Sequence, residues 1–287
     1  MENGREGKGC GACTKKGRSL LEGISPLLKS WERDGYATAP IEISKEGVHN
    51  AIDSFVSFTA IPKALRSKIC AYLPEDEKRV HLGVGIRKPE SDGDGEHKEF
   101  FHYHPDVARE FKNKILQAGP EAVDFLKHAD RLWVNIAKQV KEIIEMQITP
   151  VYYQKLTERF IPTGEKYPRV ILRFLAYKDA NESTYSAKEH YDRSTVTLAI
   201  TESAPGLWVE NPRKGKRSKI KHKAGQAVFF PWFGFNYAVD SNIQPTLHGV
   251  EQQQGEQYSN DVVRWATEVF TDIPNAPTPP KSKTVTL

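Results

Sequence analysis

The chain is poor in cysteine and contains no long apolar run. Its 287 residues include only 3 cysteines, too few for the disulfide framework that many small secreted proteins rely on. No stretch approaches the roughly 18 consecutive apolar residues that a membrane-spanning helix needs. No apolar segment follows the charged start MENGREGKGC, as a signal peptide would require. We therefore expect a soluble protein of the cytoplasm that has no contact with membranes.

Positive charge is concentrated in one short segment. The formal net charge is +4, but residues 213–223 (RKGKRSKIKHK), here called the basic segment, carry seven lysines and arginines and no acid. Segments of this kind are most often solvated loops. This one also lacks the interleaved aromatic residues on which single-stranded nucleic acid stacks. We do not expect nucleic acid as a partner, although binding of another anionic partner here stays an alternative.

Both ends of the sequence are typical of tails, and the residues between them of one domain. Residues 1–18 are rich in glycine and lysine and offer almost nothing to bury, so we expect disorder there, as in the proline-rich residues 275–287. Cys10 and Cys13 form a CxxC in the first tail, but a zinc or redox site would need a second pair or a packed scaffold. We predict a single domain over residues 19–274.

That domain divides into a helical part and a β-rich part. In residues 19–150, Ser44 can cap a helix, another helix begins near Pro62, and the clearest one starts at Pro120 and carries an apolar stripe for about six turns. In residues 151–274, short β-branched and aromatic runs alternate with turn residues, which is typical of a sandwich or small barrel. The predicted strands span 169–177, 194–200, 206–210, 226–230, 235–239, 246–250 and 262–270.

A metal-binding pattern lies in the β-rich part. His190 and Asp192 are separated by one residue beside a predicted strand, and side chains at i and i+2 of an extended chain project from the same face. His248 follows in another strand-like segment. Two histidines and one carboxylate form a facial triad that leaves coordination positions open on Fe(II). A rival pair, His102 and His104, lacks a further ligand that a strand would place.

Two more residues extend the pattern beyond the metal. Arg264 lies on the strand that follows His248, and its guanidinium is a two-pronged partner for the far carboxylate of a dicarboxylate. Tyr177 closes an earlier strand and offers a phenolic donor to the same carboxylate. Tyr191, between the first two ligands, would point away from the metal in a regular strand.

Six segments of the β-rich part match an ordered set of known motifs. They read LRFLAY, HYDRSTVTLAI, GLWV, AGQAVFF, TLHGV and RWATEVF. In this order they resemble LRxLxYP, HxDxxxLTLL, GLQV, PGxLVV, SxxHRV and RxS of the isopenicillin-N-synthase-like branch of the Fe(II)/2-oxoglutarate dioxygenases. ERDGYATAPIEI and KEFF are similar to the first half of that family, so the resemblance covers roughly residues 32–274.

The resemblance implies both a fold and a set of site residues. The fold is α+β: a distorted double-stranded β-helix, or jelly-roll barrel, buttressed by N-terminal helices that include one long helix. His190, Asp192 and His248 match the catalytic metal ligands. Arg264 matches the arginine that pairs with the C5 carboxylate of 2-oxoglutarate, and Tyr177 matches a tyrosine that also contacts this co-substrate.

One motif predicts a substrate contact, and the sequence departs from the family pattern at three places. Trp208, in GLWV, is the residue that we expect to touch the substrate. Ala266 occupies the serine position of RxS, so one co-substrate hydrogen bond is missing or has moved to Thr267. Lys178 stands where the family has proline. The segment EQQQGEQYSN lengthens the connection to the arginine and must loop out.

The expected activity is that of a non-haem iron oxidoreductase, a dioxygenase. With Fe(II), 2-oxoglutarate and O₂, the resemblance implies oxidative decarboxylation of 2-oxoglutarate coupled to hydroxylation, desaturation or ring closure of a small-molecule substrate. We expect the protein to act as a monomer. Two alternatives stay open: an oxidase of the same fold that does not use 2-oxoglutarate, and a non-enzymatic protein that binds anions through the basic segment.

Overall fold

The computed structural model describes most of the chain between residues 26 and 271. The described residues are 26–72, 81–87, 98–147, 167–178, 185–192, 196–232, 235, 243–251, 258 and 262–271. The predicted tails, with Cys10 and Cys13, lie outside them, as do residues 236–239 of one predicted strand. None of the helices in the described ranges combines the length and the apolar content that are needed to span a membrane.

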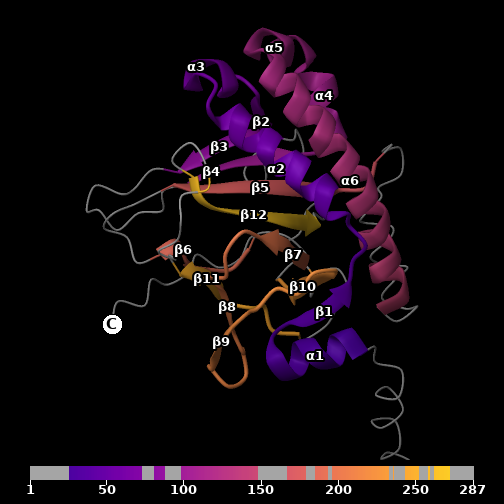
Figure 1. The fold of residues 1–287 in the computed structure, drawn as a ribbon. Helices are drawn as coiled ribbons and strands as arrows, with labels where there is room; N and C mark the ends of the chain where they lie inside the picture. Colours follow the sequence, from indigo (N-terminus) through magenta and orange to yellow (C-terminus); the bar gives the residue numbers. More distant parts are fainter. Residues whose placement is uncertain are drawn as a thin grey trace, which may run out of the picture.

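The strands of the described residues form two antiparallel sheets (Figure 1). The larger one, here called the main sheet, has the strand order β1-β10-β7-β12-β5-β4-β3-β2. Its strands are β1 (Ala37–Pro40), β2 (Cys70–Tyr72), β3 (His81–Arg87), β4 (Lys98–Tyr103), β5 (Val170–Lys178), β7 (Val196–Glu202), β10 (Gln226–Pro231) and β12 (Val262–Thr271). The small sheet has the order β6-β11-β8-β9, with β6 (Tyr185–His190), β8 (Leu207–Glu210), β9 (Arg217–Lys219) and β11 (His248–Glu251).

The helices of the described residues all precede β5. They are α1 (Pro26–Asp34), α2 (Lys45–Thr59), α3 (Lys63–Arg66), α4 (Pro105–Glu110), α5 (Lys112–Ala118) and α6 (Pro120–Gln147). The predicted cap of α2 is confirmed, because the Ser44 hydroxyl accepts a hydrogen bond from the Gly47 amide at 2.9 Å. The predicted long helix is also confirmed, as the 28-residue α6. The mixed class of helices and antiparallel sheets is thus the one that the sequence indicates.

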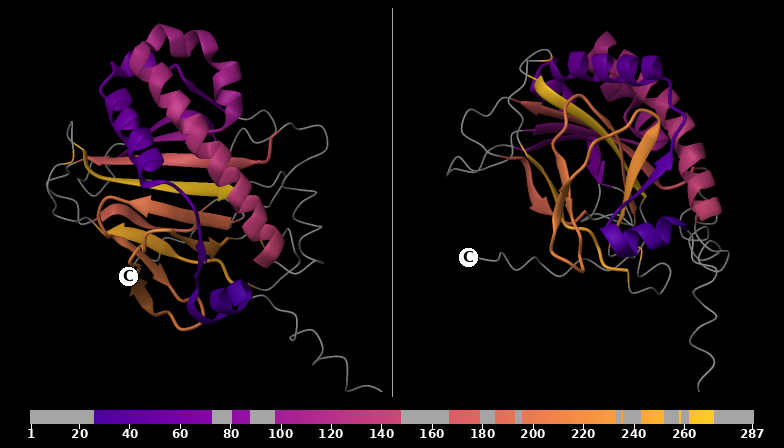
Figure 2. Two further views of the ribbon diagram at one scale, coloured as in Figure 1. Left: turned by 45° about the vertical axis from the view of Figure 1, so that its right-hand side comes forward. Right: turned by 60° about the horizontal axis from the view of Figure 1, so that its bottom comes forward.

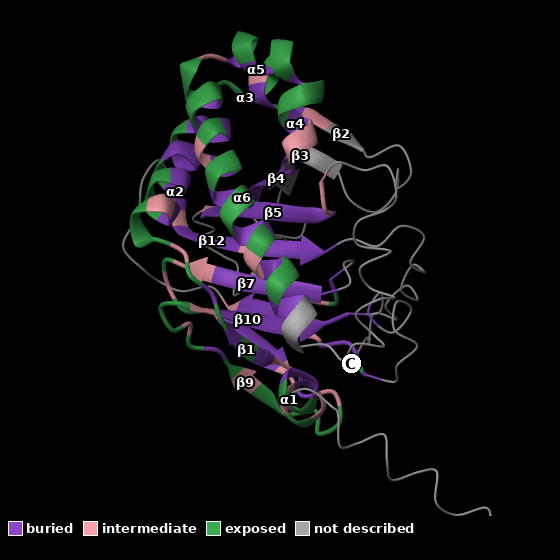
Figure 3. Ribbon diagram, turned by 90° about the vertical axis from the view of Figure 1, so that its right-hand side faces the viewer, coloured by how far each residue is buried: buried purple, intermediate pink, exposed green. Residues whose placement is uncertain are grey.

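Helices α2 and α6 cover one face of the main sheet, and the small sheet lies on the other side (Figure 2). The ring of Phe125 on α6 is the centre of this contact. It lies 5.0 to 5.2 Å from the rings of four other phenylalanines, namely Phe55, Phe58, Phe101 and Phe174. Figure 3 shows α6 with exposed residues on its outer side and buried residues against the sheet, as its single apolar stripe predicts.

The opposite face of the main sheet, here called the inner face, is turned toward the small sheet. On β5 the side chain of Phe174 lies among the helices, so Arg173, Leu175 and Tyr177 project from the inner face. A second apolar cluster joins the two sheets, and it comprises Ala187, Ala199, Leu207, Val209, Ile220, Val228, Phe230 and Val250. The space between the sheets is therefore the interior of the β-rich part.

The first half of the chain contributes strands as well as helices to this architecture. It is mainly helical, as predicted, but β1 to β4 all belong to the main sheet. Every residue of β4 is buried, so KEFFHY lacks the alternation that marks a half-exposed strand in a sequence. Helix α1 reaches the second half too, because the Trp31 indole nitrogen donates to the Phe229 carbonyl at 3.0 Å.

Candidate metal centre

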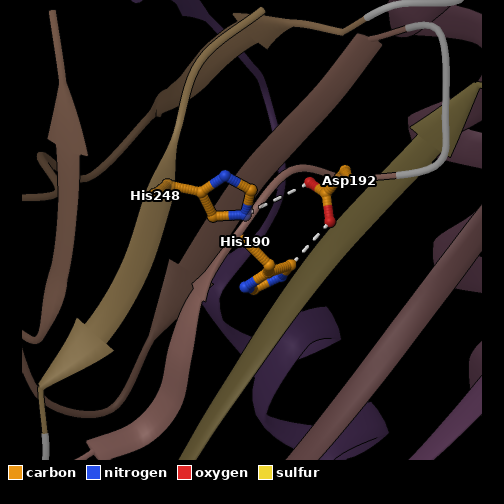
Figure 4. A group of neighbouring side chains, drawn as sticks. All are labelled: His190, Asp192 and His248. Atoms are coloured by element: carbon orange, nitrogen blue, oxygen red, sulfur yellow. Dashed lines mark ion pairs between the residues drawn. The ribbon is translucent and has the colours of Figure 1, made fainter. Parts of the chain in front are cut away.

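The three predicted ligands meet between the two sheets. His190 is the last residue of β6, His248 is the first of β11, and these two residues are directly paired in the small sheet. Asp192 follows β6 by two residues. His190 Nε2 lies 3.6 Å from Asp192 Oδ1, and His248 Nε2 lies 3.4 Å from Asp192 Oδ2. Figure 4 shows the three side chains pointing toward one another, with one ligand atom of each within 4.8 Å of the others.

Hydrogen bonds behind the triad fix the atoms that face a metal. His190 Nδ1 lies 2.7 Å from the Lys188 carbonyl, and His248 Nδ1 lies 3.2 Å from the Thr246 carbonyl. A carbonyl only accepts, so each Nδ1 carries the proton and each Nε2 keeps its lone pair. The Thr197 hydroxyl donates to Asp192 Oδ2 at 2.6 Å and orients the carboxylate. Such supporting contacts are typical of metal ligands.

Burial and charge keep the ligands in the forms that bind metal. Burial lowers the pKa of His248 to about 4, so this imidazole is neutral at neutral pH. Burial alone would raise the pKa of Asp192, but the two histidines and the Thr197 hydroxyl together hold it below its usual value. A neutral imidazole and a carboxylate are the protonation states that a metal requires. The His190 side chain is 37% exposed, against 7% for the other two ligands. The triad is therefore accessible to solvent from the side of His190.

The donor set fits Fe(II), and the rival cluster does not compete with it. Two imidazole nitrogens and one carboxylate oxygen on one side of a site match the facial triad of non-haem iron proteins. Within the described ranges, this is the only group of three or more His, Cys, Asp or Glu residues with ligand atoms so close together. His104 instead accepts from the Asp106 amide as the cap of α4, and His102 packs against Phe100 and Phe270.

The predicted co-substrate residues lie side by side on the inner face of the main sheet. Arg264 on β12 is paired with Tyr177 on β5, and its guanidinium carbon lies 4.7 Å from the centre of the tyrosine ring. Both residues are buried. Burial raises the pKa of Tyr177 to about 12 although the positive charge of Arg264 lowers it, so the phenol keeps its proton.

Arg264 already has partners within the chain, which the sequence did not indicate. Its Nη2 forms an ion pair with Glu202, and its Nε donates to the Ala204 carbonyl at 3.0 Å. Its Nη1 is buried and has no hydrogen-bond partner among the described residues. Glu202 also lies 2.9 Å from His222 Nδ1. The guanidinium therefore offers one remaining donor, next to the Tyr177 ring.

Two departures from the family pattern can be placed. Ala266 packs with Phe100, Leu175 and Tyr177, which puts it on the inner face. Thr267, the next residue, therefore projects from the opposite face, and this position does not support the alternative that Thr267 replaces the serine. Lys178, at the family's proline position, lies 3.6 Å from Glu99 in an ion pair.

Trp208 is not brought to the triad. Its neighbours Leu207 and Val209 belong to the cluster between the sheets, so its side chain projects from the outer face of the small sheet. There it lies over Gly249, where an added Cβ would be 2.7 Å from the indole. The guanidinium of Arg217 covers its ring at 4.2 Å. Substrate contact by Trp208 stays a prediction, and this position does not support it.

Arg217 also connects the two edges of the small sheet. It begins β9 at one edge, donates to Glu210 on β8 at 3.1 Å, and donates to Glu189 on β6 at the other edge at 2.5 Å. Glu189 directly precedes the ligand His190. Two more cations of the basic segment have acidic neighbours, since Arg213 lies 3.8 Å from Glu32 and Lys219 lies 2.7 Å from Glu251.

Comparison with solved structures identifies the fold. A full-length protein of Neurospora crassa, solved in complex with alpha-KG and thymine, is similar with a TM-score of 0.65 and 18% identity over 86% of this chain and 78% of that one. The Arabidopsis thaliana dioxygenase for auxin oxidation 1, solved with 2-oxoglutarate, has a TM-score of 0.62 and 15% identity over 88% and 91%. Rice dioxygenase for auxin oxidation has a TM-score of 0.56 and 15% identity over 88% and 79%. No family model and no curated protein matches the sequence.

The chain therefore has the fold of the Fe(II)/2-oxoglutarate oxygenases. Within it, the His-Asp-His triad that the sequence predicts is present. The resemblance inferred from the motifs is confirmed at this level.

Proposed function

We propose that this protein is a mononuclear Fe(II) oxygenase that uses 2-oxoglutarate and O₂ to oxidise a small-molecule substrate. The convergence of two imidazole nitrogens and one carboxylate oxygen within 4.8 Å carries the proposal. The oxygenase fold supports it, and so do neighbours that bind alpha-KG with thymine or are named for auxin oxidation. Hydroxylation is the expected outcome; desaturation or ring closure would use the same residues.

Each site residue has a role that follows from its contacts. His190, Asp192 and His248 would hold Fe(II), which with 2-oxoglutarate and O₂ supplies an oxidant able to break a C–H bond. Thr197 keeps the carboxylate oriented. The free Nη1 of Arg264 and the protonated phenol of Tyr177 are hydrogen-bond donors for the C5 carboxylate of 2-oxoglutarate.

The broader architecture belongs to the same proposal. We infer that the two sheets are the halves of a distorted jelly roll, because their inner faces share one apolar cluster, and that residues 19–274 form one domain. The continuous core of helices and main sheet supports a single domain. We further propose a cytoplasmic location, on the grounds of the scarce cysteines, and retain the monomer as a proposal.

The oxidase that does not use 2-oxoglutarate is the second candidate, and one observation favours it. Arg264 is already neutralised by Glu202, so its attraction for a second carboxylate is weaker than that of a free guanidinium. The two candidates differ in a product: only the first releases succinate when substrate turns over. Anion binding through the basic segment has less support, because Arg213, Arg217 and Lys219 already lie beside acids.

The central experiment removes one ligand at a time. His190→Ala and Asp192→Ala should each abolish stoichiometric Fe(II) binding and succinate release, because two ligands do not hold the ion. Tyr191→Phe is the matched control, since this residue lies between the two ligands and is 38% exposed. Undiminished turnover in either alanine variant would disprove the triad assignment.

A further inference from the structure

A histidine of the basic segment reaches the inner face of the main sheet. His222 Nδ1 lies 2.9 Å from Oε1 of Glu202, and its Nε2 lies 3.1 Å from the Ala199 carbonyl, both on β7. The neighbouring Lys221 and Lys223 are exposed, whereas the His222 side chain is only 12% exposed. This residue therefore points inward from between two solvated lysines.

A β-bulge in β7 places both partners of the ring on the inner face. On β12, Glu268 pairs with Ala199 and Ala266 pairs with Glu202, with a register shift between them. Paired residues share a face of a sheet, so Ala199 and Glu202 both project inward. Strict alternation would turn Glu202 toward the helices, where Ile200 packs. The extra residue of the bulge turns it inward instead.

The contacts of the ring determine how many protons it carries. A carboxylate and a carbonyl only accept hydrogen bonds, so His222 makes both bonds only when both ring nitrogens are protonated. The ring is then a positively charged imidazolium. Glu202 lies between this ring and the guanidinium of Arg264, with which it forms an ion pair. The side chains of Glu202 and Arg264 are 5% and 3% exposed, so solvent screens these charges little.

This arrangement changes the charge that a co-substrate meets. Paired with Glu202 alone, Arg264 is neutralised and attracts a second carboxylate weakly. When His222 is protonated, one carboxylate is shared by two cations, and the group of three carries a net positive charge. An anion beside Nη1 of Arg264 is then attracted more strongly than the ion pair alone would allow.

Other charges lie on the same segment or face, and each persists in the variants compared below. Lys221 and Lys223 flank the ring in the sequence and are exposed. Lys98 on β4 is buried and shares the inner face through its pairing with β5. Arg173 and Glu268 form an ion pair on that face as well. A comparison that changes only the ring therefore isolates its charge.

We propose that His222 is the positioning residue of the co-substrate site: as an imidazolium it holds Glu202 beside Arg264 and gives the site its preference for 2-oxo acids that bear a second carboxylate. This preference should weaken as the pH rises and the ring loses its second proton. The class of the co-substrate rests on the proposed function. The bridge from the basic segment through Glu202 to Arg264 does not, because the contacts themselves build it.

Two probes that differ only at the far end test the preference. 2-Oxoglutarate carries the C5 carboxylate, and 2-oxopentanoate has a methyl group in its place. Calorimetric titration of the Mn(II)-loaded protein measures the affinity for each, and their ratio removes effects of pH on the shared 2-oxo acid end. Between about pH 6 and pH 8, where imidazole gives up its second proton, wild type should lose at least about fivefold of its preference for 2-oxoglutarate.

Substitutions assign the effect to the ring. His222→Gln keeps a hydrogen-bonding side chain without the charge. At about pH 6 it should weaken the binding of 2-oxoglutarate at least about fivefold, leave that of 2-oxopentanoate unchanged, and abolish the pH dependence of the ratio. His128→Gln is the matched control, at a histidine 3.6 Å from Asp124 on α6, and should alter neither affinity nor the pH dependence.

A double-mutant cycle shows whether His222 acts through Glu202. In the Glu202→Gln background the ring has no carboxylate to hold its second proton. Adding His222→Gln should then change the ratio of the two affinities by less than about twofold. A full effect of His222→Gln in that background would overturn the positioning role.

The outcomes separate this proposal from the proposed function. If both probes bind wild type with a ratio that does not change with pH, or if His222→Gln weakens both alike, the positioning role is wrong and the proposed function stands. If neither probe binds the metal-loaded protein, the proposed function fails, and the co-substrate preference fails with it.

The bridge can also be tested without metal or co-substrate. NMR of the metal-free protein at about pH 6 should show both ring protons of His222 protected from exchange, because each is hydrogen-bonded. Rapid exchange of either proton would overturn the bridge. Circular dichroism would confirm the folding of each variant, and the wild-type measurements decide the proposal should a variant fail to fold.

Discussion

The two sheets of this molecule are held together by different means. The main sheet is covered by α2 and α6 and rests on the phenylalanine cluster around Phe125. The small sheet has strands of three to six residues, and ion pairs of Arg217 and Lys219 connect its strands. Yet the small sheet carries both histidine ligands. The comparison teaches that both histidines of the candidate metal centre lie on the layer of short strands, whereas Arg264 and Tyr177, the proposed co-substrate residues, lie on the sheet that the helices cover.

The largest expected effect is on the main sheet. Phe125→Ala removes a fully buried ring that contacts four others, and it should lower the free energy of unfolding by about 3–5 kcal/mol. Denaturant titration followed by circular dichroism would measure it. Leu116→Ala, at a residue that is 60% exposed, is the control and should change the stability by less than about 0.5 kcal/mol. Equal effects of the two changes would contradict the role of the cluster.

Acid should lower the stability of the folded protein through His248, on β11 of the small sheet. The pKa of His248 is about 4 in the folded protein and about 6.5 when unfolded. Between these values the unfolded chain binds more protons, so stability falls as the pH falls from 6.5 to 4, by on the order of 3 kcal/mol. Unfolding of metal-free protein at several pH values would show it. His248→Gln should flatten this dependence, and an unchanged slope would show that His248 is not its cause.

Replacing Arg264, the proposed partner of 2-oxoglutarate, should leave metal binding by the small sheet intact. Arg264→Leu removes the donor next to Tyr177, so the affinity for 2-oxoglutarate should fall at least about tenfold, which corresponds to about 1.4 kcal/mol, while Mn(II) still binds. Calorimetric titration of the Mn(II)-loaded protein separates the two affinities. Arg264→Lys keeps the charge and should fall in between. Unchanged 2-oxoglutarate affinity in the leucine variant would favour the oxidase.

The smallest expected effect tests the connection across the small sheet. Arg217→Ala frees β6 from β9 and uncovers Trp208, so metal affinity should fall about two- to tenfold, while stability changes by less than about 1 kcal/mol, as is usual for exposed ion pairs. The control is the double change Lys214→Ser and Lys216→Ser at exposed positions of the same segment, which should alter neither quantity. Identical metal affinities in both variants would show that the connection does not position His190.

The sequence predicts the ligands and the main elements because these depend on local patterns. His190 and Asp192 follow the period of a strand, and α6 follows the period of a helix. The remaining features depend on partners far along the chain. Glu202 meets Arg264 from 62 residues away, and no local pattern signals that pair. The alternation in GLWV separates Trp208 from its neighbours, but only the packing of β8 decides which side is the interior.

The pairing of Glu268 with Arg173 on the inner face could have been predicted from the sequence with one further step. Glu268 stands four residues after Arg264 on the same strand, and Arg173 stands four residues before Tyr177, so all four share a face by the period of two. Both residues lie inside the matched segments LRFLAY and RWATEVF, in which the family resemblance assigns roles only to Tyr177 and Arg264. A charged residue at an inward position of a barrel strand is a signal in its own right.

The attachment of α1 to the second half of the chain sets the order of events during synthesis. Trp31 donates to the Phe229 carbonyl, and the Arg33 carbonyl accepts from Asn211. At about 5–20 residues per second, a ribosome needs roughly 10–40 s to travel from α1 to these partners. During that time α1, which also packs on β1 and α6, lacks its partners in the second half of the chain. We therefore expect the nascent chain to be a client of ribosome-associated chaperones, and its first helix to be among the last elements to dock.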